Sequence, residues 1–275
     1  MVLDNTQTGA YLEAAQGCAY IIHVASPLAT QPGNLLSQAL AGTKAILDAA
    51  ESTPSVKHVV FTASTASLRP FERLLRQHPA NQAIMSGKGD EVPTMTADTE
   101  LPTQAPVSDD EPGFARYVNS KIAATNLVHE YSATHEDSHF SIVNLMPGWV
   151  MGPEELARNK QEAMKGSNLF IGWLFFDFGL GPLLGSAAGE DPPILSETVH
   201  LEDVVEAHIK ALDIDKAPGK DRNFLLCSDG PTGPVVMDAA DIVRKNLPQE
   251  VADGKIPFAG KLGRLPAVRL HVELA

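Results

Sequence analysis

The chain has 275 residues, and its 21 Lys and Arg against 34 Asp and Glu give a formal net charge of −13. This length suits one large domain, or one domain and a smaller lobe. Hydrophobic residues make up 44%, enough for a sizeable core, which excludes wholesale disorder. The acidic balance argues against nucleic acid or an anionic membrane as the main partner and leaves a small molecule.

The cysteines and the apolar runs predict the cellular environment of the protein. Cys18 and Cys227 lie in apolar contexts without a CxxC pair, which predicts reduced thiols. Residues 1–5 show neither the basic nor the apolar region of a signal peptide, so we expect a cytoplasmic protein. The most apolar stretch, 169–184, is broken by Asp177, Pro182 and several glycines, and its runs are too short for a stable membrane span of about 20 residues. It is interpreted as part of a substrate lobe or lid, with contact to a membrane surface as the alternative.

In chain order, short apolar runs alternate with helical patterns, which is typical of an α/β fold. We expect strands at 20–25, 56–63, 140–146, the start of 198–212 and 223–227. Helices are expected at 34–51, 114–134, from Glu202 to the end of 198–212, and 235–247. Strands joined by helices imply right-handed crossovers and a parallel sheet, and ligands then bind beyond the carboxyl ends of the strands.

Tyr117 and Lys121 form a YxxxK pattern in the expected helix 114–134. Residues at i and i+4 share a helix face. An ammonium beside a tyrosine favours the phenolate, which predicts a lowered pKa for Tyr117 and a proton donor for a carbonyl oxygen. A lone YxxxK is common, and the alternative is a surface pair.

Three further blocks accompany this pattern in order. The run Val59-Val60-Phe61-Thr62-Ala63-Ser64 delivers a hydroxyl at the end of a strand. A second strand ends at Pro147-Gly148, and the block 199–208 (VHLEDVVEAH) follows later. Together with Ile22-His23-Val24-Ala25-Ser26-Pro27, these blocks resemble the extended short-chain dehydrogenase/reductases of the NAD-dependent epimerase/dehydratase superfamily. The nearest branch is that of dihydroflavonol reductases, cinnamoyl-CoA reductases and fungal ketoreductase/aldehyde reductases.

The resemblance implies a Rossmann-like, doubly wound parallel sheet with a smaller C-terminal substrate lobe, and an NAD(P)-dependent carbonyl reductase that turns a ketone or aldehyde into an alcohol by hydride transfer. It makes Tyr117 the general acid and Lys121 its partner, which also reaches the nicotinamide ribose. Ser64 would orient the carbonyl, with Thr65 and Ser67 as neighbouring alternatives. The implied cofactor-binding residues are Asp4, Asn5, Val24, Ala25, Ser26, Tyr117, Lys121, Pro147 and Val150. The cofactor would be NADP or NAD, and only the branch resemblance favours NADPH.

The resemblance also implies how the chain is divided into domains. Residues 1–150 would form an incomplete dinucleotide-binding domain with an insertion or loop at 65–112. Residues 151–195 and 228–275 would form mainly the substrate lobe, and 196–227 would return to the sheet.

The run His135-Glu136-Asp137-Ser138-His139 matches HExxH, a zinc pattern. Asp137 and Ser138 suit a helix interior poorly, and no third ligand at family spacing is visible, so no metal site is expected. His23 and His200 are expected to be satisfied polar residues at strand ends.

No G-x-G-x-x-G motif occurs in the chain, and Gly87-Lys88-Gly89 does not follow a strand. By the resemblance, the glycine loop and the first two strands would precede Met1, so we expect an N-terminally truncated chain whose strand 20–25 exposes an apolar edge. This leaves open an inactive fragment or a non-catalytic Rossmann-type binding or sensor module. A sugar-nucleotide epimerase/dehydratase or a hydroxysteroid dehydrogenase is the alternative enzyme.

Overall fold

A computed structural model describes residues 4–74, 79–86, 88, 95–103, 108, 110–176, 197–213, 221–228 and 236–257. Its centre is a four-stranded sheet in the order β1-β2-β3-β6. The strands are β1 (Tyr20–His23), β2 (His58–Thr62), β3 (Ser141–Pro147) and β6 (Asp221–Leu226). All neighbouring strands run parallel, so the expected α/β fold with a parallel sheet is confirmed.

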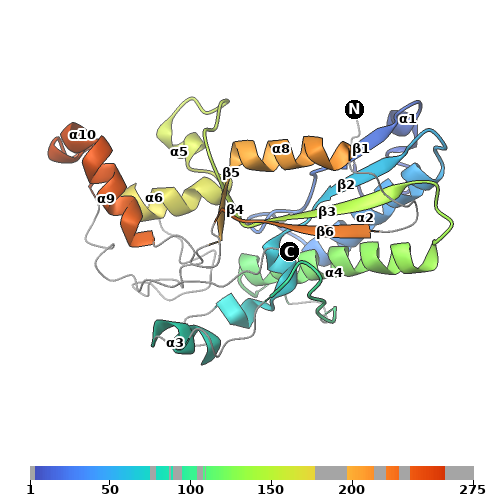
Figure 1. Cartoon of the computed structure of the whole chain (residues 1–275), viewed down its shortest axis with the longest axis horizontal. Coiled ribbons are helices and arrows are strands. Elements are labelled where there is room, and N and C mark those ends of the chain that lie inside the picture. Colours follow the sequence, from blue (N-terminus) through green and yellow to red (C-terminus); the bar gives the residue numbers. More distant parts are fainter. Residues whose placement is uncertain are drawn as a thin grey trace.

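Helices cover both faces of this sheet (Figure 1). Helices α2 (Leu35–Glu51) and α4 (Gly113–Thr134) pack on one face, and α8 (Leu201–Leu212) lies on the other. The alternation along β2 explains the layering, because successive side chains of a strand point to opposite faces. Val59 and Phe61 join the core with α2 and α4, whereas Val60 packs with Ala211 of α8.

Local features at the first residues of α2 and α4 determine where these two long helices begin. Asn34 caps α2 by accepting a hydrogen bond from the Ser37 amide at 3.0 Å, which agrees with the expected start of this helix. Helix α4 begins at Gly113, where a Cβ atom would clash with the backbone oxygen of Ala29. Only glycine therefore lets the loop after β1 pass this close to the start of α4.

The other elements surround this core. A second sheet pairs β4 (Trp149–Met151) with β5 (Thr198–His200), so among the described residues of 196–227 only β6 joins the main sheet. The segment expected as an insertion or loop contains the 3₁₀ helices η1 (Thr65–Leu68) and η2 (Phe71–Leu74) and the helix α3 (Pro79–Met85). The remaining elements are α1 (Leu12–Ala15), α5 (Lys160–Ala163), η4 (Gly166–Asn168), α6 (Leu169–Phe176), α9 (Val236–Asn246) and α10 (Pro248–Ala252).

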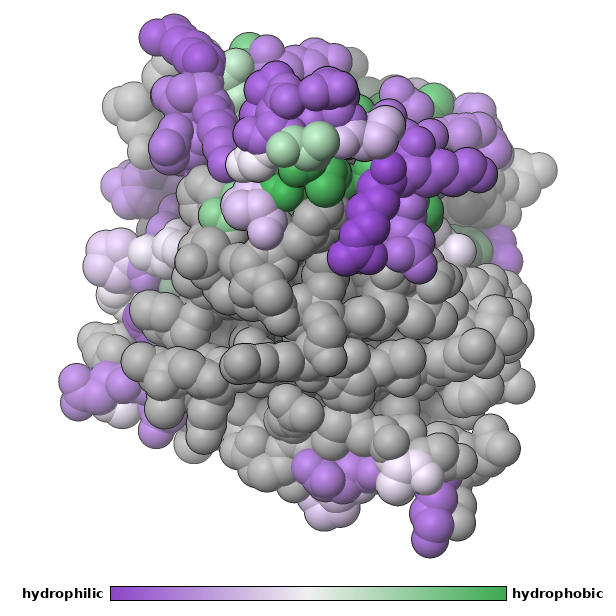
Figure 2. Space-filling view, turned by 90° about the vertical axis from the view of Figure 1, so that its left-hand side faces the viewer, coloured by the Kyte–Doolittle hydropathy of each residue, from purple (hydrophilic) through white to green (hydrophobic). Residues whose placement is uncertain are grey.

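Helices α5, α6, α9 and α10 lie together at one end of the molecule. Figure 2 views this end, and its described side chains are mostly hydrophilic around a small hydrophobic patch. The apolar stretch 169–184 forms α6 in its described part, and its remainder lies outside the described residues. Among the helices that the structure describes, none has the length and apolar character needed to cross a membrane.

Strand β1 lies at the edge of the sheet, with β2 as its partner among the described strands. Its side chains Tyr20 and Ile22 are 47% and 40% exposed, and Val24 just beyond it is 61% exposed. On the α8 face, Val205 and Ile209 are 54% and 55% exposed. The apolar edge expected for 20–25 is therefore present, although the strand itself ends at His23.

Candidate active site

The structure brings Ser64, Tyr117 and Lys121 together at the carboxyl end of β2. Ser64 lies two residues after the end of the strand, and the other two residues lie one turn apart on α4. The Lys121 Nζ atom donates to the backbone oxygens of Thr62 and Ala63 at 3.1 and 3.4 Å, and it lies 5.7 Å from the centre of the Tyr117 ring. A side-chain hydrogen bond joins Tyr117 to Ser64. The three side chains therefore lie close to one another at this end of the sheet.

Ser64 also organises the backbone around it. Its Oγ atom accepts a hydrogen bond from the Ala66 amide at 3.1 Å and so caps η1. The alternative Ser67 donates its hydroxyl to the backbone oxygen of Ser64 at 2.7 Å. Thr65 lines the same cavity as Ser64 and Tyr117. Of these three described residues, Ser64 is the one whose hydroxyl is hydrogen-bonded to Tyr117.

The expected lowering of the Tyr117 pKa is wrong for this structure. Burial raises the pKa of Tyr117 above the ordinary value of a phenol, and the hydrogen bond with Ser64 opposes this rise only in part. The reason is that desolvation penalises the charged phenolate more than the neighbouring groups stabilise it. Tyr117 therefore keeps its proton at neutral pH, which is the form that a general acid needs.

Burial also lowers the pKa of Lys121 and that of His23, which lines a cavity with Lys121. It lowers the pKa of Lys121 to about 8, because an ammonium loses hydration in the interior. His23 at the end of β1 has its pKa lowered to about 4 by burial and then by the charge of Lys121. Near neutral pH Lys121 is therefore a cation, whereas the His23 imidazole and the Tyr117 phenol are neutral.

Two cavities adjoin this group of residues. The first has a volume of about 440 Å³ and is lined by residues that include Asn5, His23, Ala25, Ser26 and Lys121. The second has a volume of about 200 Å³, and its lining includes Ser64 and Tyr117. Tyr117 and Lys121 thus belong to different cavities while lying on one face of α4.

The first cavity suits the ribose side of a nicotinamide cofactor. It contains four of the expected contacts, Asn5, Ala25, Ser26 and Lys121. An ammonium has three N–H donors, and the contacts with Thr62 and Ala63 use two of them, which leaves one for a ribose hydroxyl. The remaining N–H donor of Lys121 therefore fits a ribose hydroxyl at the nicotinamide end of the cofactor. We assign no contact to the phosphates.

Of the other expected cofactor residues, Tyr117 lines the second cavity, and Asp4, Val24, Pro147 and Val150 line neither. Asp4 is exposed, and its carboxylate accepts hydrogen bonds from Thr6, which lower the pKa of Asp4. Val24 is exposed at the end of β1. Pro147 ends β3 and Val150 lies within β4, next to the Gly148 and Trp149 that line the second cavity.

Sequence reasoning missed several residues of the second cavity. Phe114 and Trp149 stack at 5.6 Å between ring centres, and Phe114 also stacks on Tyr117 at 5.5 Å. Arg69 lines the same cavity and pairs with Glu197. The sequence could have indicated Phe114, because this residue lies three positions before Tyr117 on α4. No local pattern could have indicated the contact between Arg69 and Glu197, because these residues lie 128 positions apart.

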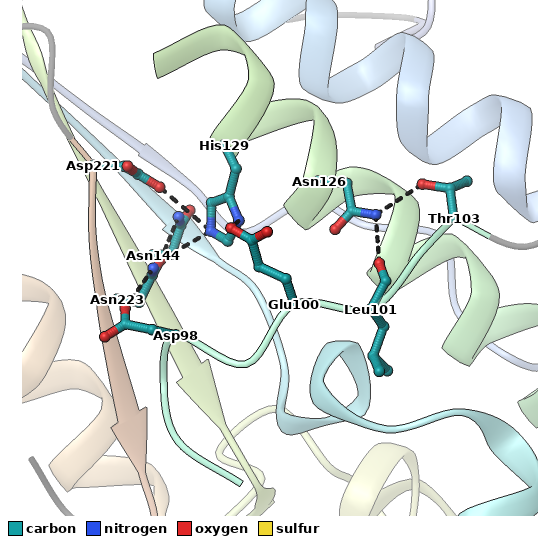
Figure 3. Close-up of polar contacts among 9 residues, drawn as sticks. All are labelled: Asp98, Glu100, Leu101, Thr103, Asn126, His129, Asn144, Asp221 and Asn223. Atoms are coloured by element: carbon teal, nitrogen blue, oxygen red, sulfur yellow. Dashed lines mark hydrogen bonds and ion pairs between the residues drawn. The ribbon is translucent and has the colours of Figure 1, made fainter. Parts of the chain in front are cut away.

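A separate polar cluster lies further along α4 (Figure 3). His129 is 3.3 Å from Asp221 and 3.5 Å from Glu100, and it contacts Asn223 Oδ1 at 3.3 Å. Asn223 also accepts from Asn144 at 2.8 Å and donates to Asp98 at 3.2 Å. Asn126 donates to Leu101 and Thr103. This cluster ties the segment 98–103 to α4, β3 and β6, and it gives the segment a structural role.

The histidines discussed from sequence have local partners. His135 stacks on Tyr131 at 4.1 Å just after α4 ends, and the His139 Nε2 atom lies 3.1 Å from the Thr53 backbone oxygen. His200 caps α8 by accepting from the Glu202 amide at 3.3 Å. Within the described part of the chain, no group of three or more His, Cys, Asp or Glu could hold a metal ion.

Comparison with known proteins agrees with this fold. The chain is 29% identical over 272 residues to an NAD-dependent epimerase/dehydratase of Alternaria alternata, covering 94% of this chain and 70% of that protein. It is 28% identical over 272 residues to a ketoreductase of Cercospora nicotianae, covering 95% and 68%. Among solved structures, Gre2 from Candida albicans in complex with NADPH aligns with a TM-score of 0.64 at 21% identity, covering 90% of this chain and 68% of that one. No family model matches the sequence.

The structural likeness establishes the Rossmann-like fold. The sequence relatives agree with the expected resemblance: homologues named NAD-dependent epimerase/dehydratase and ketoreductase support a reductase branch of the epimerase/dehydratase superfamily.

Proposed function

We propose that this protein is an NAD(P)-dependent carbonyl reductase in which Tyr117 protonates the oxygen of a ketone or aldehyde. The observation that carries the proposal is the convergence of Tyr117, Ser64 and Lys121 between two cavities. The ketoreductase and epimerase/dehydratase relatives support this reaction class. NADPH is the favoured cofactor, because structural neighbours carry it.

When bound, a nicotinamide cofactor supplies the hydride that adds to the carbonyl carbon. The protein supplies position and charge. Ser64 lies within hydrogen-bonding reach of Tyr117, so both hydroxyls can point at one carbonyl oxygen in the second cavity. Tyr117 gives its proton to that oxygen as negative charge develops, and the product is an alcohol. The Lys121 ammonium stabilises the phenolate that remains.

Residues 1–150 supply the described lining of the first cavity and would hold the cofactor. The same range supplies most of the second cavity, to which Gly166, Ser167 and Leu169 of 151–195 add, so both ranges would contact the substrate. A small-molecule carbonyl compound is the proposed partner. Its aromatic surroundings, Phe114, Tyr117 and Trp149, favour an apolar group beside the carbonyl. The cytoplasmic location stays a prediction from sequence.

The test is consumption of NADPH and NADH with a panel of aromatic and aliphatic ketones and aldehydes, with the product identified by mass. We expect an alcohol formed in a one-to-one ratio with the oxidised cofactor. Binding of cofactor without turnover of any carbonyl compound would instead favour a binding or sensor module.

A further inference from the structure

Helix α8 brings a buried histidine against the end of β2. His208 is only 7% exposed, and the same helix packs Ala211 against Val60 of β2. The Nε2 atom of His208 lies 2.7 Å from the Thr62 hydroxyl oxygen, and its Nδ1 atom lies 2.7 Å from the Val204 backbone oxygen. Both ring nitrogens therefore have a partner in a region where an unpaired polar atom would be costly.

The partners determine the direction of both hydrogen bonds. A backbone oxygen can only accept, so Nδ1 carries a proton and donates it to Val204. In the neutral imidazole Nε2 is then an acceptor, and the Thr62 hydroxyl donates to it. An apolar side chain would fill this place in the core without any such requirement. The contact between His208 and Thr62 therefore fixes the side chain of Thr62 in one orientation.

The Thr62 carbonyl points toward a place that β1 does not reach. The Ala63 amide donates to the Leu145 backbone oxygen of β3 at 2.8 Å. The N–H and C=O of one trans peptide point in opposite directions, so the Thr62 carbonyl points away from β3 and toward the side of β1. Strand β1 ends at His23, which is paired with Phe61. Among the described strands, none therefore offers a residue opposite Thr62 on that side.

Lys121 supplies the donor that a strand residue would otherwise give. Its Nζ atom donates to the Thr62 oxygen at 3.1 Å from α4, on the face of the sheet opposite α8. A chain of direct contacts thus runs through the sheet, from His208 on one face, through Thr62, to Lys121 on the other. A small displacement of a positioned group can cost a large factor in rate, so the orientation of Thr62 matters to the site.

We propose that His208 is a positioning residue of the active site: through the Thr62 hydroxyl it holds the Thr62 carbonyl where the Lys121 ammonium binds it. The proposal rests on the proposed function in taking Lys121 as the cation that serves Tyr117. It gives α8, which lies across the sheet from the reacting groups, a part in orienting them.

The test removes the contact without leaving an unpaired group. The double variant His208→Leu/Thr62→Val replaces both partners by apolar side chains of similar shape, a change that is nearly neutral for stability. The matched control, His58→Leu/Ser141→Ala, removes another histidine–hydroxyl contact of 2.7 Å at the opposite end of β2. Denaturant unfolding should place both double variants close to the parent, and all labelling is done where each protein is folded.

The first readout is the reactivity of Lys121 toward trace acetic anhydride at pH 7, measured by mass spectrometry of its peptide. The reagent reacts with the neutral amine and can enter through the first cavity, which Lys121 lines. Lys44, whose side chain is 67% exposed on α2, is the reference in the same sample. We expect the ratio of Lys121 to Lys44 labelling to rise about three- to tenfold in His208→Leu/Thr62→Val, since the ammonium loses part of a hydrogen bond. The ratio should stay at the parent value in the control.

Turnover and a conservative variant give a second readout. We expect kcat/KM for carbonyl reduction to fall about 10–10²-fold in His208→Leu/Thr62→Val, as for a small displacement of a positioned group, and to stay close to the parent in the control. His208→Gln keeps a side-chain acceptor for the Thr62 hydroxyl, so its labelling ratio should stay near that of the parent. Should the first double variant not fold, Thr62→Val alone makes the same comparison, because valine has the shape of threonine.

A labelling ratio that stays at the parent level without the His208 contact, or that rises equally in the control, overturns the proposal whatever the rate of reduction. The result is separable from the reaction itself, because labelling needs no turnover. A raised ratio in a protein that reduces no carbonyl compound supports the role of His208 and counts against the reductase.

Discussion

At the scale of single residues, the protonation states of the site follow from burial more than from neighbouring charge. Tyr117 keeps its proton because desolvation raises its pKa, although the YxxxK spacing predicted the opposite direction. The spacing correctly placed Lys121 beside Tyr117, since i and i+4 neighbours meet on any helix. It could not report how deeply the site is buried, because that depends on residues such as Trp149 that pack around it from elsewhere in the chain.

The charge of Lys121 predicts a pH dependence of the reaction. Its pKa is lowered to about 8, so the ammonium is present below that pH and is lost as the pH rises through it. We expect kcat/KM for carbonyl reduction to fall as the pH rises past this value. The His23 pKa of about 4 keeps that neighbour neutral over the same range, so its titration does not mask the effect.

The measurement is a pH profile of kcat/KM with a single ketone. The variant Lys121→Arg keeps its charge throughout, so any activity that it retains should not show the fall. A parent profile that stays constant through the titration range of Lys121 contradicts the role given to its charge.

Ser64 allows a finer test of positioning. Ser64→Ala removes the side-chain partner of Tyr117 and one donor to the carbonyl oxygen. We expect kcat to fall by about 10²–10³, as for other single donors to a developing oxyanion. Thr65→Val is the matched control in the same cavity, and it should lose much less. Equal losses of kcat in both variants would mean that the Ser64 hydroxyl has no specific role in the reaction.

At the scale of elements, sequence patterns predicted the parts with local causes. Helix α2 has its cap at Asn34, and β3 is a continuous buried run, so both were found close to their observed bounds. The pairing of β4 with β5 and the contact between Arg69 and Glu197 join segments far apart in sequence. No local pattern encodes such contacts, and this part of the site was therefore missed.

The junction of β4 and β5 predicts a stability effect. Gly148→Ala places a Cβ atom against the Glu197 backbone and must displace that segment together with the buried ion pair. We expect a loss of about 1–3 kcal/mol in unfolding free energy, typical of forced overpacking.

The control for this change is Gly42→Ala within α2. Its added methyl group would lie 3.7 Å from the Asn5 backbone oxygen, an ordinary contact. Alanine is also the better helix former, so we expect a gain of about 0.5–1 kcal/mol. Denaturant unfolding measures both variants. Equal stability of the two would show that the close approach at Gly148 is not a constraint.

At the scale of the whole molecule, apolar side chains are exposed at the edge strand β1 and on α8. Tyr20, Ile22 and Val24 are exposed along β1, and Val205 and Ile209 are exposed on α8. An apolar sheet edge offers unpaired backbone groups to other chains and promotes association. We expect the protein to associate with increasing concentration.

A charge on the edge strand should reduce this association. Ile22→Lys places an ammonium on β1 without removing a buried side chain, since Ile22 is 40% exposed. Leu156→Lys is the control, because Leu156 is 86% exposed and lies away from the edge strand in a turn. Sedimentation velocity over a concentration series should show less association for Ile22→Lys alone. An equal effect of both variants would point to net charge and not to the edge.

The central claim is that Tyr117 gives a proton to a carbonyl oxygen while a cofactor gives a hydride to its carbon. The most direct measurement is a single turnover with reduced NADP deuterated at the transferring position, comparing the parent with Tyr117→Phe. We predict that the parent product carries deuterium on the alcohol carbon and that Tyr117→Phe binds the cofactor with similar affinity but transfers deuterium at least about 10² times more slowly. Transfer at the same rate in both proteins would contradict the account.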